Sequence, residues 1–274
     1  MTFNLRCDTP RDGENQWPHR KEAVVDLIRR RRPDVAGLQE ALPHQLAYLR
    51  ENLHEYGFLG EGRNGGGQGE HTPVVYRRDR FRVVASHTFW LSETPDVPGS
   101  MSWETACTRI ATWAVLAPAG GGAEPAGWPE ILVVNTHLDH RSQPARERGA
   151  ALVMRFIDET AGARPVIVTG DFNGEPGNPA VREFLDGGHR VRLRDTLAVH
   201  LGLGPGEGGP GTFHGFRGIE GAASRIDYVL ASADLAVRHA QVVTDSPAGR
   251  PVSDHFPVEA DLAFDVHAGP RGAG

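Results

Sequence analysis

Residues 165–173, with the sequence Pro-Val-Ile-Val-Thr-Gly-Asp-Phe-Asn, constrain the fold of this chain more than any other stretch. The three β-branched apolar residues 166–168 are typical of a strand that is buried on both faces. The strand ends at Gly170, and Asp171 and Asn173 follow at alternate positions. Because residues two apart on an extended backbone project to the same side, we expect this carboxylate and amide to point the same way. Taken alone, the pattern is better explained by an Asx turn that closes a strand.

Several other strand-like runs also end in polar side chains, and this repetition favours a functional site. The polar groups that end the predicted strands are Asn4, Glu40, Glu70, His137, Asp171, Asn173, Asp227, Asp254 and His255. Carboxylate and amide oxygens are the ligands that hard cations such as Mg²⁺ prefer. Histidines beside carboxylates suit proton transfer and the stabilisation of a charged transition state. No Cys/His spacing indicates structural zinc.

The rest of the chain alternates strand-like and helix-like segments. The other strands are predicted at residues 2–6, 35–38, 74–76, 81–91, 108–116, 131–134, 226–230, 237–243 and 258–264, and the helices begin near Pro18, Pro43, Ala145 and Pro179. We expect Ala151, Leu152, Phe156 and Ile157 to form the buried face of the third helix. Many strands with a few intervening helices predict a two-sheet α/β sandwich with helices outside. We expect one domain over residues 1–267 and a disordered tail at 268–274.

Composition and charge exclude several classes of protein. The chain has 274 residues, of which 39% are hydrophobic and 23% charged, values that are ordinary for a soluble globular protein. No apolar run of about 18 residues exists, so we expect no membrane-spanning segment. No signal peptide is visible, which predicts a cytoplasmic protein, although a longer natural N-terminus would also fit. The net charge of −6 argues against a broad basic face for long nucleic acid. Cys7 and Cys107 do not make a disulfide framework.

Six short motifs in a fixed order make the sequence resemble the endonuclease/exonuclease/phosphatase superfamily. They are Thr-Phe-Asn-Leu-Arg at 2–6, Leu-Gln-Glu at 38–40, Asn-Thr-His-Leu at 135–138, Gly-Asp-Phe-Asn at 170–173, Arg-Ile-Asp-Tyr at 225–228 and Ser-Asp-His at 253–255. Each motif alone is weakly specific, but together they span essentially the whole chain. The resemblance implies a four-layer α/β/β/α sandwich of two mainly antiparallel sheets flanked by helices. It also implies a hydrolase of phosphate esters that depends on Mg²⁺ or Mn²⁺.

The resemblance further implies roles for the oxygen-bearing side chains. Asn4 and Glu40 would lie at the principal metal position, with Asp254 close by. Asp171 and Asn173 would orient or deprotonate the attacking water and would hold the phosphoryl group. These assignments match the preference of hard cations for oxygen ligands, which the residues alone already suggest.

Other roles follow from the same resemblance. His137 and His255 would flank the scissile phosphate as hydrogen-bond donors, and Asp227 would orient His255. Glu70 would pair with His137, as the equivalent acid does in several superfamily members. Arg109 would reach a phosphate oxygen, although its motif is looser.

Each of these residues also has a purely structural explanation. Arg109 is equally well explained as an inward-facing structural arginine. His140 and His214 fit local hydrogen bonding better than metal ligation, while His214 is also a candidate for lining the substrate pocket. For single residues the structural explanation is usually the better one, but it does not account for the whole set.

The sequence therefore predicts metal-assisted hydrolysis of a phosphate ester by a positioned water, with no covalent nucleophile. Superfamily substrates range from nucleic acids to inositol phosphates and phospholipids, and the fold does not choose among them. We expect a monomer that acts on a small or nucleotide-like ester, short nucleic acid included, with a DNA or RNA nuclease as the alternative. Two other classes are a catalytically silent phosphate-binding module and a glycoside hydrolase, which the histidines and the amides of Asn4 and Asn173 fit poorly.

Overall fold

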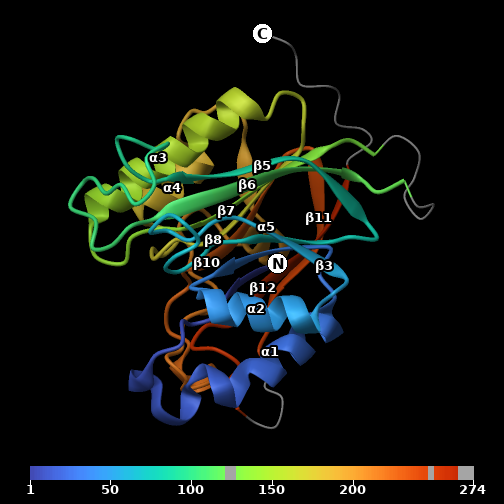
Figure 1. Cartoon of the computed structure of the whole chain (residues 1–274). Coiled ribbons are helices and arrows are strands. Elements are labelled where there is room, and N and C mark those ends of the chain that lie inside the picture. Colours follow the sequence, from blue (N-terminus) through green and yellow to red (C-terminus); the bar gives the residue numbers. More distant parts are fainter. Residues whose placement is uncertain (121–127, 246–249, 265–274) are drawn as a thin grey trace.

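The structure is a computed structural model that describes residues 1–120, 128–245 and 250–264. Two six-stranded sheets pack face to face, and helices cover both outer faces (Figure 1). This architecture confirms the predicted four-layer sandwich. The predicted tail at 268–274 lies outside the described residues. Within the described part of the chain, no helix is both long and apolar enough to cross a membrane.

The first sheet has the strand order β11-β12-β1-β2-β4-β3. Its strands are β1 (Thr2–Asn4), β2 (Val35–Gln39), β3 (Tyr56–Leu59), β4 (Val74–Arg77), β11 (Leu235–Val242) and β12 (Val258–Phe264). β1 and β2 run parallel, with Asn4 beside Gln39, and the other neighbours are antiparallel. The carboxyl ends of β1 and β2 therefore deliver Asn4 and Glu40 to the same edge of the sheet.

The second sheet has the order β5-β6-β7-β8-β10-β9. Its strands are β5 (Phe81–Trp90), β6 (Ile110–Pro118), β7 (Ile131–His137), β8 (Val166–Asp171), β9 (Leu193–Asp195) and β10 (Asp227–Ser232). β7 and β8 are its parallel pair, and their register places His137 beside Asp171. β10 runs antiparallel to β8 and places Asp227 on the other side of Asp171. Three polar side chains thus meet where β7 and β8 end and β10 begins.

Two helices cover each sheet from outside (Figure 1). α1 (Trp17–Arg31) and α2 (Pro43–Asn52) share one apolar core with the first sheet, and α3 (Gln143–Thr160) and α4 (Pro179–Asp186) share another with the second. All four helices carry proline in their first turn, where no backbone N–H needs an intrahelical acceptor. α5 (Thr196–Leu201) and the 3₁₀ turns η1 (Pro10–Asn15) and η2 (Ile219–Gly221) lie in the connections.

A buried amide network ties the two sheets together. Asn135 of the second sheet donates to the carbonyls of Leu38 and Pro73 in the first, at 2.8 and 3.0 Å. Its Oδ1 accepts from Gln39 Nε2 at 2.7 Å. Glycine is required at position 37, because a Cβ there would come within 2.1 Å of Thr169 Oγ1. Since buried amides are costly unless their hydrogen bonds are made, this network fixes the relative position of the sheets and of their polar edges.

Candidate active site

The polar ends of both sheets meet in one cavity of about 780 Å³. Most of the predicted site residues line it, and the exceptions are Asn4, Asp227 and His214, which are buried behind its wall. The chain turns sharply as it leaves the strands, because Arg6, Glu40 and Asn173 all have left-handed backbone conformations, with φ values of 57°, 60° and 48°. Such conformations are unfavourable for residues other than glycine and concentrate at functional sites.

Glu40 is the carboxylate that follows β2 of the first sheet and lines the cavity. Its Oε2 accepts from the Cys7 backbone N–H at 3.0 Å, and its Oε1 accepts from Asn4 Nδ2 at 3.1 Å. Burial on its own raises the pKa of this carboxyl, but the His137 ring, the Cys7 amide, the His255 ring and Asn4 together bring the pKa down to about 2. Glu40 therefore stays ionised across the physiological range, as a metal ligand must.

Asn4 joins the two sheets rather than facing the cavity. Its Nδ2 donates both to Glu40 Oε1 and, at 3.0 Å, to Asp171 Oδ2. Its Oδ1 accepts from the Arg6 backbone N–H at 2.9 Å. In this orientation no oxygen of Asn4 is offered to the cavity, so the structure places it as a bridge between two carboxylates and not as the metal ligand that was expected.

Asp254 enters the cavity from the connection before β12. Its Oδ2 lies 3.7 Å from Arg6 Nε, which is too far for a hydrogen bond. Burial raises the pKa of Asp254, the His255 charge opposes that change, and the neighbouring Glu40 raises the pKa further. The two carboxylates therefore repel each other across the cavity, and a cation between them would relieve that repulsion.

Asp171 lies at the centre of the site. Its Oδ1 accepts from the Asn173 backbone N–H at 2.9 Å, which is an Asx-turn contact, and its Oδ2 accepts from Asn4. The turn and the functional role were alternatives in the sequence, and the geometry permits both. Burial first, and the charge of Asp227 second, raise the pKa of Asp171. A carboxyl with a raised pKa is suited to accept a proton near neutral pH.

His255 is bonded to a buried carboxylate. Its Nδ1 lies 2.8 Å from Asp227 Oδ2, and its Nε2 lies 3.8 Å from Asp171 Oδ2. Burial lowers the pKa of the ring, but the charge and hydrogen bond of Asp227, together with the charges of Asp171 and Asp254, outweigh burial and raise the pKa to about 10. The ring is therefore a cation at neutral pH, with Nε2 directed toward the site. Through this contact Asp227 is in position to orient the His255 ring.

His137 has the opposite charge state. Burial first and the cation of Arg109 second hold the pKa of its ring well below the ordinary 6.5. Its Nε2 lies 3.0 Å from Asn173 Nδ2, which can donate to the neutral ring, and 3.4 Å from Asp171 Oδ2. The site thus holds one charged and one neutral histidine on opposite sides of Asp171. His137 Nε2 thus faces Asn173 and Asp171, and its role as a hydrogen-bond donor to the phosphate stays a prediction.

Two expectations about supporting residues are wrong. Glu70 accepts a hydrogen bond from Arg63 at 2.6 Å and not from His137. Arg63 and Glu70 lie close together because they belong to the same glycine-rich loop. His214 is fully buried and packs its ring 4.1 Å from that of Phe256, so it does not line the pocket. Its backbone N–H instead donates to the Asp254 carbonyl at 2.9 Å.

Several cavity residues lie outside the predicted catalytic and metal-binding set, although residues 212–216 were expected to shape the pocket. Phe213 and Phe216, on either side of His214, form an apolar wall, and the Phe213 ring packs edge-on against His255 at 5.0 Å. Arg63 and His140 lie on the same cavity. The aromatic residues do stand in the motif Thr-Phe-His-Gly-Phe, but nothing in a loop sequence shows which of its side chains points inward.

The donor set suits a hard divalent cation. Glu40 and Asp254 both line the cavity, both are oxygen donors, and the charge of Glu40 contributes to the raised pKa of Asp254. Asp171, Asp227 and His255 also place donor atoms within 4.8 Å of one another. Because His255 is already bonded to Asp227 within that group, we favour Glu40 and Asp254 as the ligands.

Comparison with known proteins places the chain in a family. The profile of the Endonuclease/Exonuclease/phosphatase family matches residues 1–255. A protein of that description from Bacteroides vulgatus is 35% identical, with a TM-score of 0.85 over 96% of this chain and 97% of its own. A mannosyl-6-phosphatase from Bacteroides thetaiotaomicron is 32% identical, with a TM-score of 0.83 over 96% and 98%.

Curated relatives are more distant and much longer. Nocturnin of Drosophila melanogaster is 27% identical over 199 residues, which are 66% of this chain and 28% of that protein. Another match is a probable RNA exonuclease of Saccharomyces cerevisiae, and this chain covers 38% of the length of that protein. The family match over nearly the whole sequence, together with the confirmed sandwich, leads to one conclusion: the chain belongs to the Endonuclease/Exonuclease/phosphatase family, whose members are phosphoric ester hydrolases.

Proposed function

We propose that the protein is a divalent-metal-dependent hydrolase that acts on a small phosphate ester of sugar or nucleotide size. The observation that carries this proposal is the cavity itself, which holds ionised Glu40 and the Asp254 carboxyl group beside the cationic His255 ring and the Arg109 guanidinium. Such a site offers both a cation-binding side and an anion-binding side for one phosphate group. The likeness to a mannosyl-6-phosphatase over nearly the whole chain supports a small substrate.

Glu40 and Asp254 would hold the cation, which when bound would offset charge on the phosphoryl and leaving oxygens. Asn4 serves this arrangement indirectly, because its Nδ2 holds Glu40 and Asp171 at 3.1 and 3.0 Å. The Cys7 amide fixes the second Glu40 oxygen at 3.0 Å. The chain thus orients its anionic ligand through two donors before any substrate arrives.

Asp171 would accept the proton of the attacking water. It is buried, its pKa is raised, and Asn173 fixes one of its oxygens at 2.9 Å. His255 would donate from Nε2 to the phosphoryl group, since Asp227 keeps its ring charged and oriented. Neutral His137 would position the Asn173 amide at 3.0 Å. No residue of the described site is placed as a covalent nucleophile, so positioning and electrostatics supply most of the rate.

The leaving group would pack against the apolar wall of Phe213 and Phe216. An aromatic wall suits the ring of a sugar or a base, so it supports both a sugar phosphatase and a nucleotide-directed hydrolase. The relatives Nocturnin and the yeast RNA exonuclease favour the second candidate, a nuclease. We infer that residues 1–267 form one catalytic domain, because side chains from both sheets build the described site, and we propose that this domain acts as a monomer.

The test is a substrate panel with and without metal. Purified protein is dialysed against EDTA and assayed with Mg²⁺ or Mn²⁺ on hexose phosphates, nucleotides, an aryl phosphodiester and a short oligonucleotide. We expect turnover only with metal, and fastest on a small ester. Glu40→Gln should remove the metal response, while Glu22→Gln, at an exposed position on α1, should not. Full activity after EDTA dialysis would contradict the proposed role of the cation.

A further inference from the structure

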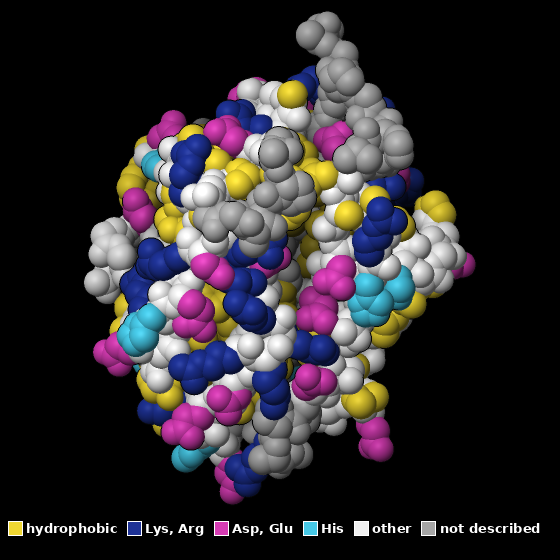
Figure 2. Space-filling model, turned by 90° about the vertical axis from the view of Figure 1, so that its right-hand side faces the viewer, with side chains coloured by type: hydrophobic (Ala, Val, Ile, Leu, Met, Phe, Trp, Pro, Cys, Tyr) yellow, Lys and Arg dark blue, Asp and Glu magenta, His cyan; other side chains and the backbone are white. Residues whose placement is uncertain are grey.

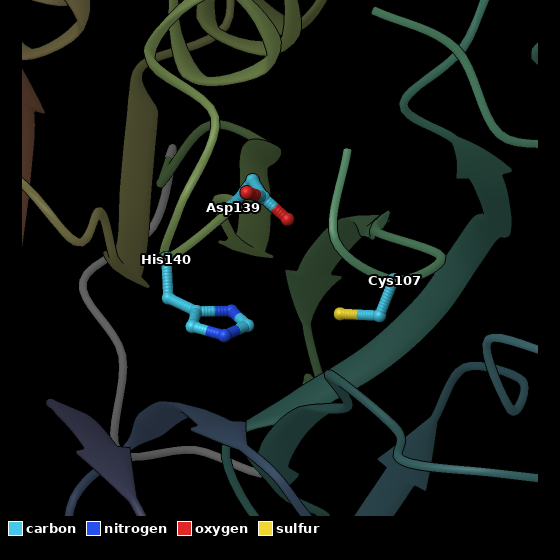
Figure 3. Close-up of side chains that lie close together, drawn as sticks. All are labelled: Cys107, Asp139 and His140. Carbon is cyan, nitrogen blue, oxygen red and sulfur yellow. The ribbon is translucent and has the colours of Figure 1, made fainter. Parts of the chain in front are cut away.

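Three side chains outside the catalytic group converge on the edge of the same cavity. Figure 3 shows the Cys107 thiol and the His140 ring pointing toward each other, with the Asp139 carboxylate nearby. Each residue contributes one donor atom, and these atoms all lie within 4.8 Å of one another. Cys107 and His140 line the cavity, whereas Asp139 is almost fully buried. The set has the composition of a zinc site, so its hydrogen bonds decide what it does.

Asp139 has no free oxygen for a metal. Its Oδ2 accepts from Thr105 Oγ1 at 2.8 Å and from the Ala106 N–H at 2.9 Å. Its Oδ1 accepts from the Arg141 and Ser142 N–H groups at 2.9 and 2.6 Å. A carboxylate with two donors on each oxygen is saturated as an acceptor. Binding a cation there would break bonds that the fold already makes.

The guanidinium of Arg109 lies directly beside this cluster. Arg109 Nη2 lies 2.9 Å from His140 Nδ1, and Arg109 Nε lies 3.8 Å from Asp139 Oδ2. The Arg109 side chain is only 6% exposed, yet its Nε is buried without a hydrogen-bond acceptor. A guanidinium at this distance would repel a metal ion from the imidazole. The cluster is therefore arranged around an arginine and not around a metal.

The loop held by Asp139 is strained. Trp103 and Glu104 both have left-handed conformations, with φ values of 58° and 57°. Ser142 Oγ donates to the Trp103 carbonyl at 2.9 Å, and Asp139 binds the next two residues. Two consecutive left-handed residues cost free energy that neighbouring contacts must offset. These contacts fix the conformation of the loop that leads into β6. Arg109 lies immediately before the first residue of that strand.

We propose that His140 and Asp139 are positioning residues that hold the Arg109 guanidinium toward the cavity, where its remaining donors meet an anionic oxygen of the substrate. This inference rests on the proposed function and names the residues that prepare its anion-binding side. Arg109 lines the cavity, and a phosphate oxygen there can accept a charge-assisted hydrogen bond from its guanidinium. His140 accepts at Nδ1 only while that nitrogen is unprotonated.

The surroundings of His140 favour that neutral form. Burial lowers the pKa of the ring, Arg109 and Arg141 lower it further, and Asp139 and Glu40 act in the opposite direction. His140→Asn would keep an acceptor near the Nδ1 position but would not titrate, so it serves as the conservative variant. His140→Ala removes the acceptor altogether.

The experiment measures binding of inorganic phosphate by calorimetry to the full chain with Mg²⁺ present. We expect Arg109→Met to weaken binding roughly 10- to 100-fold, as loss of a charged hydrogen bond does, and His140→Ala to weaken it about 3- to 10-fold. The double variant should bind no more weakly than Arg109→Met alone, because His140 acts through Arg109. His140→Asn should restore most of the affinity. His87→Ala, at an exposed position on β5, is the control.

Three outcomes would overturn the inference. They are additive losses in the double variant, failure of His140→Asn to rescue, and absence of phosphate binding by the unchanged protein. Titration with Cd²⁺ tests the metal alternative, since a thiolate–metal absorption lost in both Cys107→Ser and His140→Ala would assign the cluster to a metal. If phosphate binding follows the expected pattern but no ester is hydrolysed, the proposed function is contradicted. The inference that His140 and Asp139 position Arg109 would still hold.

Discussion

The proposed chemistry at this site depends on one pair of buried residues, Asp227 and His255. Their 2.8 Å contact holds the ring and keeps it charged, because the carboxylate raises a pKa that burial alone would lower. His137, buried nearby without such a partner, has a pKa well below 6.5. Two histidines on the same cavity therefore have different charge states, and Asp227, which is buried behind the cavity wall, contributes to the difference.

Asp227→Asn should reduce kcat by roughly 10²- to 10⁴-fold, the usual contribution of a positioned acid–base group, with little change in KM. The folded-state pKa of His255 is about 10, so the ring is charged below that pH. Without the Asp227 carboxylate, only Asp171 and Asp254 oppose the effect of burial, so the pKa of His255 falls and the ring loses its charge at a lower pH. The loss of activity should therefore grow as pH rises from 6 to 9, as measured by pH–rate profiles. An unchanged kcat in folded Asp227→Asn would contradict this role.

At the level of single residues, the sequence predicted most of the side chains that line the cavity, and it failed for some of those in loops. Asp171, Asn173 and Glu40 line the cavity because strand alternation and strand ends determine where they point. Glu70 and His214 belong to loops whose direction depends on tertiary contacts: Glu70 lines the cavity but pairs with Arg63, and His214 is buried away from the cavity. Asp139 was overlooked although it stands two residues after His137, because its importance lies in hydrogen bonds to backbone groups distant in the chain.

At the level of elements, the long segments were predicted and some of the short ones were missed. The strand at 258–264 was predicted with its observed bounds, while β3, β9 and α5, with four, three and six residues, were not recognised. Such short segments offer too few residues for a period to be visible. The buried face of α3 was also only partly predicted: Ile157 is buried, but Ala151, Leu152 and Phe156 are half-buried. An almost continuous apolar run at 149–154 hides the helical phase.

A prediction about α3 concerns its attachment to the connection before β9. Asp158 accepts from the Val191 and Arg190 backbone N–H groups at 2.9 and 3.2 Å and contacts His189 Nδ1 at 3.1 Å. Burial raises the pKa of Asp158, but these donors outweigh burial and lower it below 3.8. Asp158→Asn turns one acceptor into a donor that faces N–H groups. We therefore expect the free energy of unfolding to fall by about 1–2 kcal/mol at pH 7.

The pH dependence of that loss has a definite sign. A carboxyl with a lowered folded-state pKa stabilises the fold above its unfolded pKa, and this contribution disappears as pH falls through the folded value. Urea unfolding of both proteins should therefore show a constant difference above about pH 5 that shrinks below about pH 4. Asp186→Asn is the control, because its pair with Arg182 is more than half exposed on both sides and should matter little. A difference that does not depend on pH would contradict the assignment.

At the level of the whole molecule, the sandwich aligns two parallel strand pairs so that their ends meet. Asn4 from one sheet and Asp171 from the other are hydrogen-bonded at 3.0 Å, although 167 positions separate them in the chain. The network around Asn135 sets this alignment from within the core. The sequence showed that such polar ends exist, but only the packing of the two sheets shows which of them touch.

The charge of the whole molecule leads to the last prediction, which concerns substrate size. The net charge is −6, and the face on the right of Figure 1 carries Lys/Arg and Asp/Glu side by side, with no broad area of one sign (Figure 2). A protein that grips about six phosphates loses affinity steeply with salt, with a slope near roughly −0.9 per contact on logarithmic axes. One phosphate held by Arg109 and His255 in a cavity predicts a shallow slope. We expect kcat/KM on a small ester to change little between low and moderate salt, and to exceed kcat/KM on duplex DNA. A steep slope with preference for the duplex would instead favour a DNA nuclease.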